Sequence, residues 1–256
     1  MMKKFLLLLL ASFAVHAQEK INFREGKLSD ILKIAKAENK PLLYMGYATW
    51  CEHCKKMKSE VITDKAVADY FNTNFVCMWQ DMESGEGVDI RKKYSVRAFP
   101  TFLFFNPAGD LLYSVSGELT AAEFIGEGQN AFNEKKQFPY LKAQFDADPK
   151  NPDKCLAYVS ALRRSNFDTE PIVKNYFSGM PDEQLVTENN WRIIANGVRD
   201  INSREFQYVL KNQAAFAGVS SAKRVDKKIV NMVQEWLTPF VDRLDTVGYM
   251  EKRRSA

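Results

Sequence analysis

Histidine is almost absent from this sequence, which has only two among 256 residues. His16 lies in a leader-like segment at the start, so His53 is the single histidine that we expect in the mature chain. A metal site built from several histidines is therefore excluded. A Ser-His-Asp triad is excluded as well, unless it uses His53.

The sequence also lacks a concentrated block of one charge. It has 36 Lys and Arg residues against 32 Asp and Glu residues, a net charge of +4. Removal of residues 1–17, which include two lysines and no acid, lowers this to +2. The short basic stretch at residues 252–254 is interpreted as a solvated end. Because nucleic-acid binding needs a concentrated basic face, we expect no nucleic-acid partner.

Long apolar runs are missing too. Residues 5–15 form an apolar run of eleven residues after Lys3 and Lys4, but a bilayer span needs about 20. Residues 15–17, Val-His-Ala, place small side chains where a signal peptidase reads the chain. We therefore expect a cleaved signal peptide at residues 1–17 and a periplasmic or otherwise secreted protein. An uncleaved anchor is the alternative, although anchors usually have a longer run.

Four cysteines are too few to staple a chain of this length, even in an oxidising compartment. Cys51 and Cys54 are only three residues apart, which indicates chemistry. Cys77 lies in an apolar strand-like run and Cys155 on an apolar helical face, so both are interpreted as core residues. The alternatives are a disulfide between these two or a regulatory role.

Strand and helix patterns alternate in the first half of the chain. Strands are expected at residues 21–23, 41–48, 75–79, 101–105 and 111–116, and helices at 28–35, 51–61, 88–94 and 119–132. Helices between strands predict an α/β fold with a mixed sheet covered on both faces. After about residue 137 the strand signals stop, and apolar faces recur at helical spacing. We expect one domain over 18–136 and an all-α domain over 137–256.

The segment Trp50-Cys51-Glu52-His53-Cys54 carries the chemistry. A thiol at the mouth of a helix has a pKa below its usual ~8.5, because free backbone N–H groups and the helix dipole favour an anion. Only a thiolate attacks a disulfide, so Cys51 is predicted to be the nucleophile and Cys54 the resolving thiol. Protonated His53 would stabilise the Cys51 thiolate, whereas Glu52 would oppose it, so both residues tune the site.

A Cys-x-x-Cys pair can also be half of a zinc site. That interpretation needs two further ligands. The candidates are His53, Cys77, Cys155 and carboxylates, since no second Cys-x-x-Cys or histidine pair exists. We therefore expect no metal and no cofactor.

The sequence resembles the thioredoxin superfamily over residues ~20–135. The resemblance rests on the strand at 42–47, on Trp50 before Cys51, on the run Phe99-Pro100-Thr101 about fifty residues later, on the following hairpin and on Gly117. The stretches Cys-Lys-Lys-Met at 54–57 and Val-Ile-Thr-Asp at 61–64 are most similar to the extracytoplasmic thioredoxin-like group. That group includes the C-terminal domain of the membrane-embedded thiol reductant carrier, and it resembles protein disulfide isomerases.

The resemblance implies a thioredoxin-like mixed sheet and a redox-active disulfide between Cys51 and Cys54. It also implies a cis bond before Pro100, pairing of the Phe99 backbone with the substrate chain, and room for that chain at Gly117. Trp50, Phe99, Pro100, Thr101 and Gly117 are then the substrate-binding residues. An ordinary trans proline and a plain glycine at a strand end are the alternatives.

The sequence departs from thioredoxin at the active site. Glu52-His53 replaces Gly-Pro, Met45 stands where a buried acid is usual, and Cys77 stands where its lysine partner is usual. The pair that helps to move a proton to the second cysteine is therefore missing. Glu60 or another carboxylate is the candidate to substitute for it.

We expect an exported protein disulfide oxidoreductase that contributes to redox homeostasis and exchanges disulfides with proteins through Cys51 and Cys54. Its expected partners are protein thiols and disulfides, together with a membrane-bound electron donor or acceptor. The sequence leaves the direction of electron flow and the oligomeric state open. Two alternatives remain: a non-catalytic thioredoxin-fold binding module, and a thiol-based metal carrier.

Overall fold

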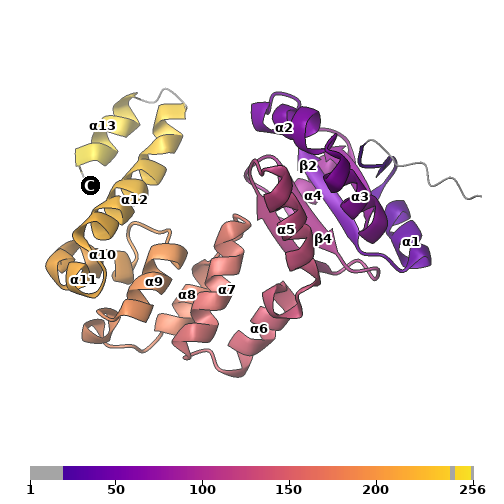
Figure 1. Cartoon of the computed structure of the whole chain (residues 1–256). Helices are drawn as coiled ribbons and strands as arrows, with labels where there is room; N and C mark the ends of the chain where they lie inside the picture. Colours follow the sequence, from indigo (N-terminus) through magenta and orange to yellow (C-terminus); the bar gives the residue numbers. More distant parts are fainter. Residues whose placement is uncertain (1–19, 243–245, 255–256) are drawn as a thin grey trace, which may run out of the picture.

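The structure is a computed structural model that describes residues 20–242 and 246–254. The expected signal peptide at residues 1–17 lies outside the described residues. Figure 1 shows a sheet covered by helices, followed by a series of helices that leads away from the sheet and turns back, so that the described chain forms an open U. Within the described ranges, no helix is both long and apolar enough to cross a membrane.

Five strands form one mixed sheet in the order β1-β3-β2-β4-β5. β3 runs parallel to both β1 and β2, whereas β4 runs antiparallel to β2 and β5. The strands are β1 (Phe23–Arg24), β2 (Leu42–Tyr47), β3 (Val76–Asp81), β4 (Thr101–Phe105) and β5 (Leu111–Ser116). The predicted fold class is confirmed. The first strand nevertheless begins later than expected, because Ile21 packs into the core and donates its N–H to the carbonyl of Ile62 at 3.2 Å.

Helices cover both faces of the sheet, because successive side chains of a strand point to opposite faces. The helices of this half are α1 (Leu28–Glu38), α2 (Glu52–Lys56), α3 (Lys65–Asn74), α4 (Glu86–Lys93) and α5 (Ala121–Phe132). One face of the sheet packs with α3 and α5 around Phe71, Phe102 and Phe124. The other face packs with α1 and α4 around Ile31 and Ile90.

The helix predicted over residues 51–61 is regular only in its first part. After α2 the chain continues as η1, a π-helical turn over Met57–Val61, in which the N–H of Ile62 donates to the carbonyl of Met57 at 2.9 Å. The next helix is α3, and its N-cap is Asp64. Its side chain accepts the N–H of Val67 at 3.0 Å, which satisfies a donor that the helix itself leaves free.

The second half of the described chain is entirely helical. Its elements are η2 (Glu134–Lys136), α6 (Phe138–Ala147), α7 (Pro152–Arg164), α8 (Glu170–Phe177), η3 (Asp182–Leu185), α9 (Glu188–Gly197), α10 (Arg204–Lys211), α11 (Gln213–Val219), α12 (Ala222–Asp242) and α13 (Thr246–Arg254). A separate apolar core holds it together, with Val159, Ile194 and Phe216 among its buried members. Gly197 lets α9 approach closely, because a Cβ there would lie 2.4 Å from Val173 and 2.8 Å from Val159.

Contacts between the two halves are few and gather at the edge strand β5. Leu111 and Phe167 pack at the margins of both the helical core and one core of the sheet. The hydroxyl of Ser165 donates to the carbonyl of Ser114 at 2.8 Å, and the guanidinium of Arg164 lies 5.7 Å from the ring centre of Tyr113. The helical half therefore covers a strand edge that would otherwise be open to pairing with other chains.

We propose that one domain ends at residue 136 and that the helical domain begins at residue 137. This division predicts that a chain truncated after Lys136 still folds. The buried members of both sheet cores precede that residue, so the truncated chain should unfold in one cooperative transition. The truncated chain lacks Phe167, which packs at the margin of one sheet core, and this loss should lower the free energy of unfolding by about 2–3 kcal/mol. Urea unfolding followed by circular dichroism measures this, with Phe167→Ala in the full chain as a control that should reproduce part of the loss. A truncated chain without a cooperative transition would show that the halves share one core.

Candidate active site

The carboxyl end of β2 places both cysteines of the predicted motif at the mouth of α2. Cys51 is the N-cap of this helix, and its sulfur accepts the N–H of Cys54 at 3.1 Å. The two sulfurs form a disulfide, with Cα atoms 5.2 Å apart. Cys51 and Cys54 expose only 4% and 3% of their surface. Ala48, Tyr47 and Phe99 enclose them in a small apolar cluster of their own.

The segment before β4 lies against this disulfide. The Phe99–Pro100 peptide bond is cis, and the carbonyl of Pro100 accepts the N–H of Gly117 at 2.8 Å. The Thr101 hydroxyl donates to the carbonyl of Ala98 at 2.7 Å, which fixes the turn that carries Phe99. The structure thus brings Phe99, Pro100, Thr101 and Gly117 together, and Phe99 packs against the two cysteines.

The backbone conformation at position 117 favours glycine. Its φ is +110°, a region that side chains other than glycine rarely adopt, and a Cβ there would meet no atom within 4 Å. The space beside its backbone is therefore open, as the resemblance implies.

Trp50 marks the outer rim of the site and is 63% exposed. Its indole N–H donates to the carboxylate of Glu83 at 2.7 Å, and this carboxylate also binds Arg91 at 3.0 Å. The Arg91 guanidinium lies 5.0 Å from the ring centre of Phe99, and that ring packs edge-on against Trp50. The four side chains therefore form a closed ring of contacts next to Cys51. Sequence reasoning found Trp50 and Phe99 but missed Glu83 and Arg91.

A carboxylate that sequence reasoning also missed holds His53. Glu118 accepts a hydrogen bond at His53 Nδ1 at 2.6 Å and pairs with Lys56 through its other oxygen. The hydrogen bond from Lys56, followed by that from His53, holds the pKa of Glu118 below its usual range. Glu52 instead pairs with Lys55 at 2.6 Å on the exposed side of α2. The two predicted tuning residues therefore lie in different electrostatic surroundings.

No buried carboxylate lies under the disulfide. Met45 and Cys77 are both buried in one core of the sheet, as expected for apolar replacements of a charged pair. In the part of the chain that the structure describes, the buried polar and charged side chains do not include an Asp or a Glu. Glu60, the candidate substitute, is exposed and acts electrostatically on Lys56.

Cys77 and Cys155 are free and buried, which confirms their interpretation as core residues. They belong to different apolar cores, so no disulfide joins them. Burial raises the pKa of the Cys77 thiol, and it raises that of Cys155 to about 12. Neither thiol is therefore ionised near neutral pH, whereas the Cys51 sulfur already accepts a backbone hydrogen bond.

Metal binding was the alternative use of the Cys51 and Cys54 thiols. Over residues 20–242 and 246–254, no three His, Cys, Asp or Glu side chains group so that they could hold a metal ion.

Comparisons with known proteins agree with this geometry. The model of a family described as a thioredoxin-like domain matches residues 28–131. The chain is 32% identical over 98 residues to protein disulfide-isomerase A5 of Bos taurus, and 31% identical over 100 residues to the thiol:disulfide interchange protein DsbD of Yersinia pestis. Each match covers 38% of this chain, but only 18% and 17% of those proteins.

Among solved structures, a disulphide-isomerase candidate from Bacteroides thetaiotaomicron is 43% identical, with a TM-score of 0.42, over 45% of this chain and 96% of that one. The oxidised C-terminal domain of Neisseria meningitidis DsbD is 20% identical, with a TM-score of 0.36, over 40% of this chain and 90% of that domain. Residues 28–131 therefore form a thioredoxin-like domain, homologous to parts of DsbD and of protein disulfide isomerases.

Proposed function

We propose that the chain is an exported thiol–disulfide oxidoreductase that exchanges disulfides with protein substrates through Cys51 and Cys54. The observation that carries this proposal is the position of Cys51. Its sulfur lies at the N-cap of α2 and accepts a backbone N–H, so the site already provides a hydrogen bond for a thiolate. Relatives named as a disulfide isomerase and as a thiol:disulfide interchange protein support the same chemistry.

The exchange takes place in two steps. In the reduced protein, the Cys51 thiolate attacks one sulfur of a substrate disulfide, and the other substrate sulfur leaves as a thiolate. Cys54 then loses its proton and attacks the Cys51 sulfur of the mixed disulfide. The Cys51–Cys54 disulfide forms and the substrate leaves with two electrons more. The reverse sequence oxidises a substrate dithiol.

Residues beside the disulfide position the substrate chain. Phe99 offers backbone groups next to the two sulfurs, and Gly117 leaves open space on the other side of Pro100. Trp50 gives an exposed aromatic surface at the rim. We assign these residues, with Thr101 as the support of the turn, to substrate binding.

Export rests on the signal peptide expected at residues 1–17, and the proposed compartment is periplasmic or otherwise extracytoplasmic. In such a compartment a reductant needs a membrane-bound electron donor and an oxidant needs an acceptor. The proposed partners are therefore substrate thiols or disulfides and one such membrane protein.

Substitution of the two cysteines tests the function. Cys51→Ser should lower the reduction of insulin by dithiothreitol to the uncatalysed rate, because no thiolate remains to attack. Cys54→Ser should instead accumulate a mixed disulfide with the substrate, because the resolving step is lost. The readout is insulin turbidity, together with non-reducing electrophoresis. Cys77→Ala is the control and should keep the activity. Equal turnover by Cys51→Ser and the unaltered chain would refute the proposal.

The equilibrium of the Cys51–Cys54 couple with glutathione, read by thiol alkylation, tests the tuning. His53→Ala should shift the potential by about 30 mV toward the reducing side, because a protonated His53 would stabilise the thiolate. Glu52→Gln is the matched control and should shift it less, because Lys55 already pairs with Glu52. Equal shifts would contradict this tuning. For the unaltered chain we expect a potential above the ~−270 mV of thioredoxin.

The contacts of Glu118 predict that its carboxyl group titrates below the usual pKa of a glutamate. Its lowered pKa means that the pairs with Lys56 and His53 are present at neutral pH and are lost as the pH falls through that pKa. Lys56→Gln should raise the pKa of Glu118 toward its usual value, because the hydrogen bond from Lys56, which lowers this pKa most, is lost. Carboxyl-carbon NMR measures this. Lys55→Gln, one residue away and paired with Glu52, is the control. An unchanged pKa of Glu118 in Lys56→Gln would show that the pair does not form in solution.

A further inference from the structure

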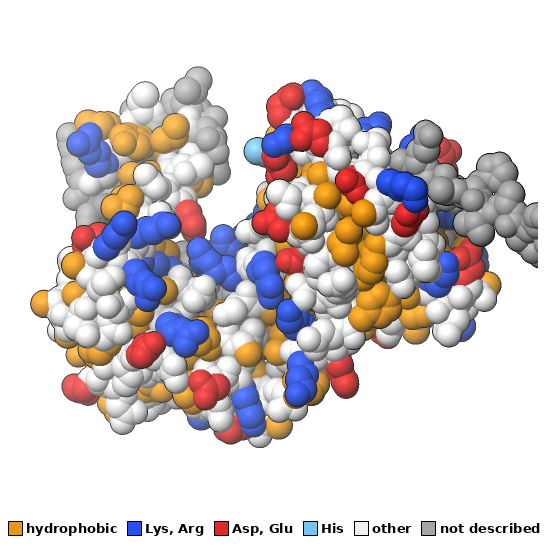
Figure 2. Space-filling model, viewed as in Figure 1, with side chains coloured by type: hydrophobic (Ala, Val, Ile, Leu, Met, Phe, Trp, Pro, Cys, Tyr) orange, Lys and Arg blue, Asp and Glu red, His pale blue; other side chains and the backbone are white. Residues whose placement is uncertain are grey.

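A hollow between the two halves of the chain has two arginines among its lining residues. It has a volume of about 790 Å³, with Arg97 on the sheet side and Arg199 and Trp236 on the helical side. Arg97 belongs to the segment between α4 and the cis peptide bond, only three residues before Pro100. Lys and Arg side chains gather between the two arms of the U (Figure 2). We call this site the basic hollow and define it by Arg97 and Arg199; Arg163 and Lys228 line a neighbouring pocket that shares Glu235 with it.

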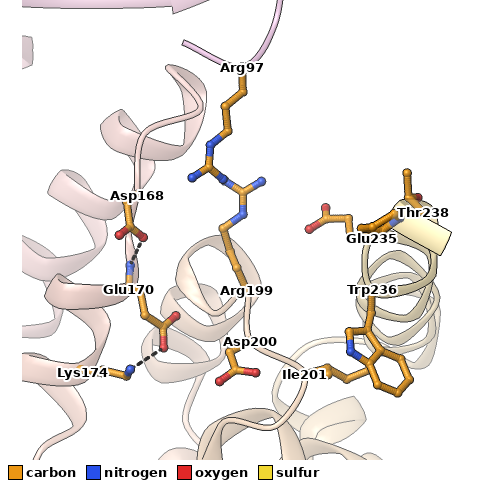
Figure 3. Close-up of a pocket in the computed structure, with 11 residues that line it drawn as sticks. Arg97, Asp168, Glu170, Lys174, Arg199, Asp200, Ile201, Glu235, Trp236 and Thr238 are labelled. Atoms are coloured by element: carbon orange, nitrogen blue, oxygen red, sulfur yellow. Dashed lines mark hydrogen bonds and ion pairs between the residues drawn. The ribbon is translucent and has the colours of Figure 1, made fainter. Parts of the chain in front are cut away.

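Arg97 and Arg199 point their guanidinium groups toward one another (Figure 3). Neither group makes an ion pair or a side-chain hydrogen bond with any residue in the described ranges. Two like charges that face each other repel unless an anion lies between them. Two planar guanidinium groups also offer the fork geometry that carboxylates bind with two hydrogen bonds.

Two further cations lie on the helical side. Lys228 is only 8% exposed, and its ammonium group donates to the carbonyl of Val198 at 2.6 Å. Arg163 donates to the carbonyl of Asn196 at 3.3 Å. Burial, followed by the charge of Arg163, lowers the pKa of Lys228 to about 8. Both cations are thus hydrogen-bonded to neutral carbonyl groups, and Glu235, which lines both pockets, acts electrostatically on Lys228.

Four acidic side chains also line the hollow, and one of them, Glu170, is neutralised by an ion pair. Asp168 accepts the N–H of Glu170 at 3.0 Å, Glu170 pairs with Lys174 at 3.5 Å, and Asp200 accepts the N–H of Asn202 at 2.9 Å. Glu235 lines the hollow from α12. These acids would repel a uniformly charged polyphosphate or nucleic acid, whereas a polypeptide can place single carboxylates at the arginines and neutral residues elsewhere.

The basic hollow is connected to the active site. A second pocket, of about 350 Å³, shares Arg97 with it and is lined by Arg91 and Lys92 without any acid. Arg91 in turn lies over the ring of Phe99, which packs against the two cysteines. Phe99, Arg91 and Arg97 therefore connect the disulfide to the hollow through ring contacts and a shared pocket wall.

We propose that the basic hollow binds an acidic segment of a polypeptide, with carboxylates seated on Arg97 and Arg199, while a neighbouring stretch of the same partner reaches Cys51. The binding itself needs no redox chemistry, but the identity of the partner as a substrate rests on the proposed function. The helical half would then select substrates by charge, which the thioredoxin-like half alone does not do.

Binding of peptides to the oxidised full chain tests the proposal without thiol exchange. The probe is a short fluorescein-labelled peptide with several glutamates, compared with a twin that has glutamines instead, by fluorescence anisotropy at low and high salt. We expect the acidic peptide to bind about tenfold more tightly than its twin, and salt to reduce the difference. Arg97→Gln with Arg199→Gln should remove about tenfold of affinity. Lys33→Gln with Lys36→Gln, an equal charge change on α1, should not.

Equal binding of the two peptides, or equal loss in the two double variants, would overturn the proposal. Displacement of the acidic peptide by short-chain polyphosphate of equal charge at lower concentration would overturn the assignment to a polypeptide. The experiments distinguish a failure of this proposal about the hollow from a failure of the proposed function. Selective binding together with full insulin turnover by Cys51→Ser would leave the hollow intact and refute the oxidoreductase. Turnover that depends on Cys51, without selective binding, would refute the hollow alone.

Discussion

The position of β2 in the middle of the sheet is the constraint on which the active site depends. Its first five residues are fully buried, because α3 and α5 cover one face and α1 and α4 the other. Neighbouring strands fix its register on both sides. A strand held in this way ends at a defined point in space, and the chain leaves it directly into the turn before α2. The place and direction of Cys51 follow from that end.

Charges around the disulfide come from segments that are far apart in the chain. Glu83 and Arg91 flank Trp50 and Phe99 on one side, and Glu118 holds His53 and Lys56 on the other. The site therefore has no buried acid beneath it but has a paired carboxylate at its rim. This arrangement differs from that implied by the resemblance to thioredoxin, where a buried carboxylate serves the second cysteine. It places the charged groups that flank the two cysteines at the surface of the protein.

Much of the first half could be predicted from the sequence, because its signals are local. A strand buried on both faces reads as an apolar run, as at residues 101–105, which form β4 with the predicted bounds. The π-helical turn after Lys56 was not predicted, and β1 begins two residues later than expected, because hydrogen bonds and packing with distant segments decide both. In the second half the sequence indicated helices without their bounds, because apolar residues at helical spacing mark a buried face and not where a helix ends.

The amino-acid sequence by itself determined the chemistry of the site: two cysteines at one helix mouth, a proline before the next strand, and two further cysteines in apolar surroundings. These are properties of neighbouring residues, so they can be read along the chain. Only the tertiary structure decided which charges act on them. Glu118 reaches His53 across 65 positions, and Arg97 comes to face Arg199 from the other half of the chain. Such contacts depend on how separate cores pack, and no local pattern in the sequence records that.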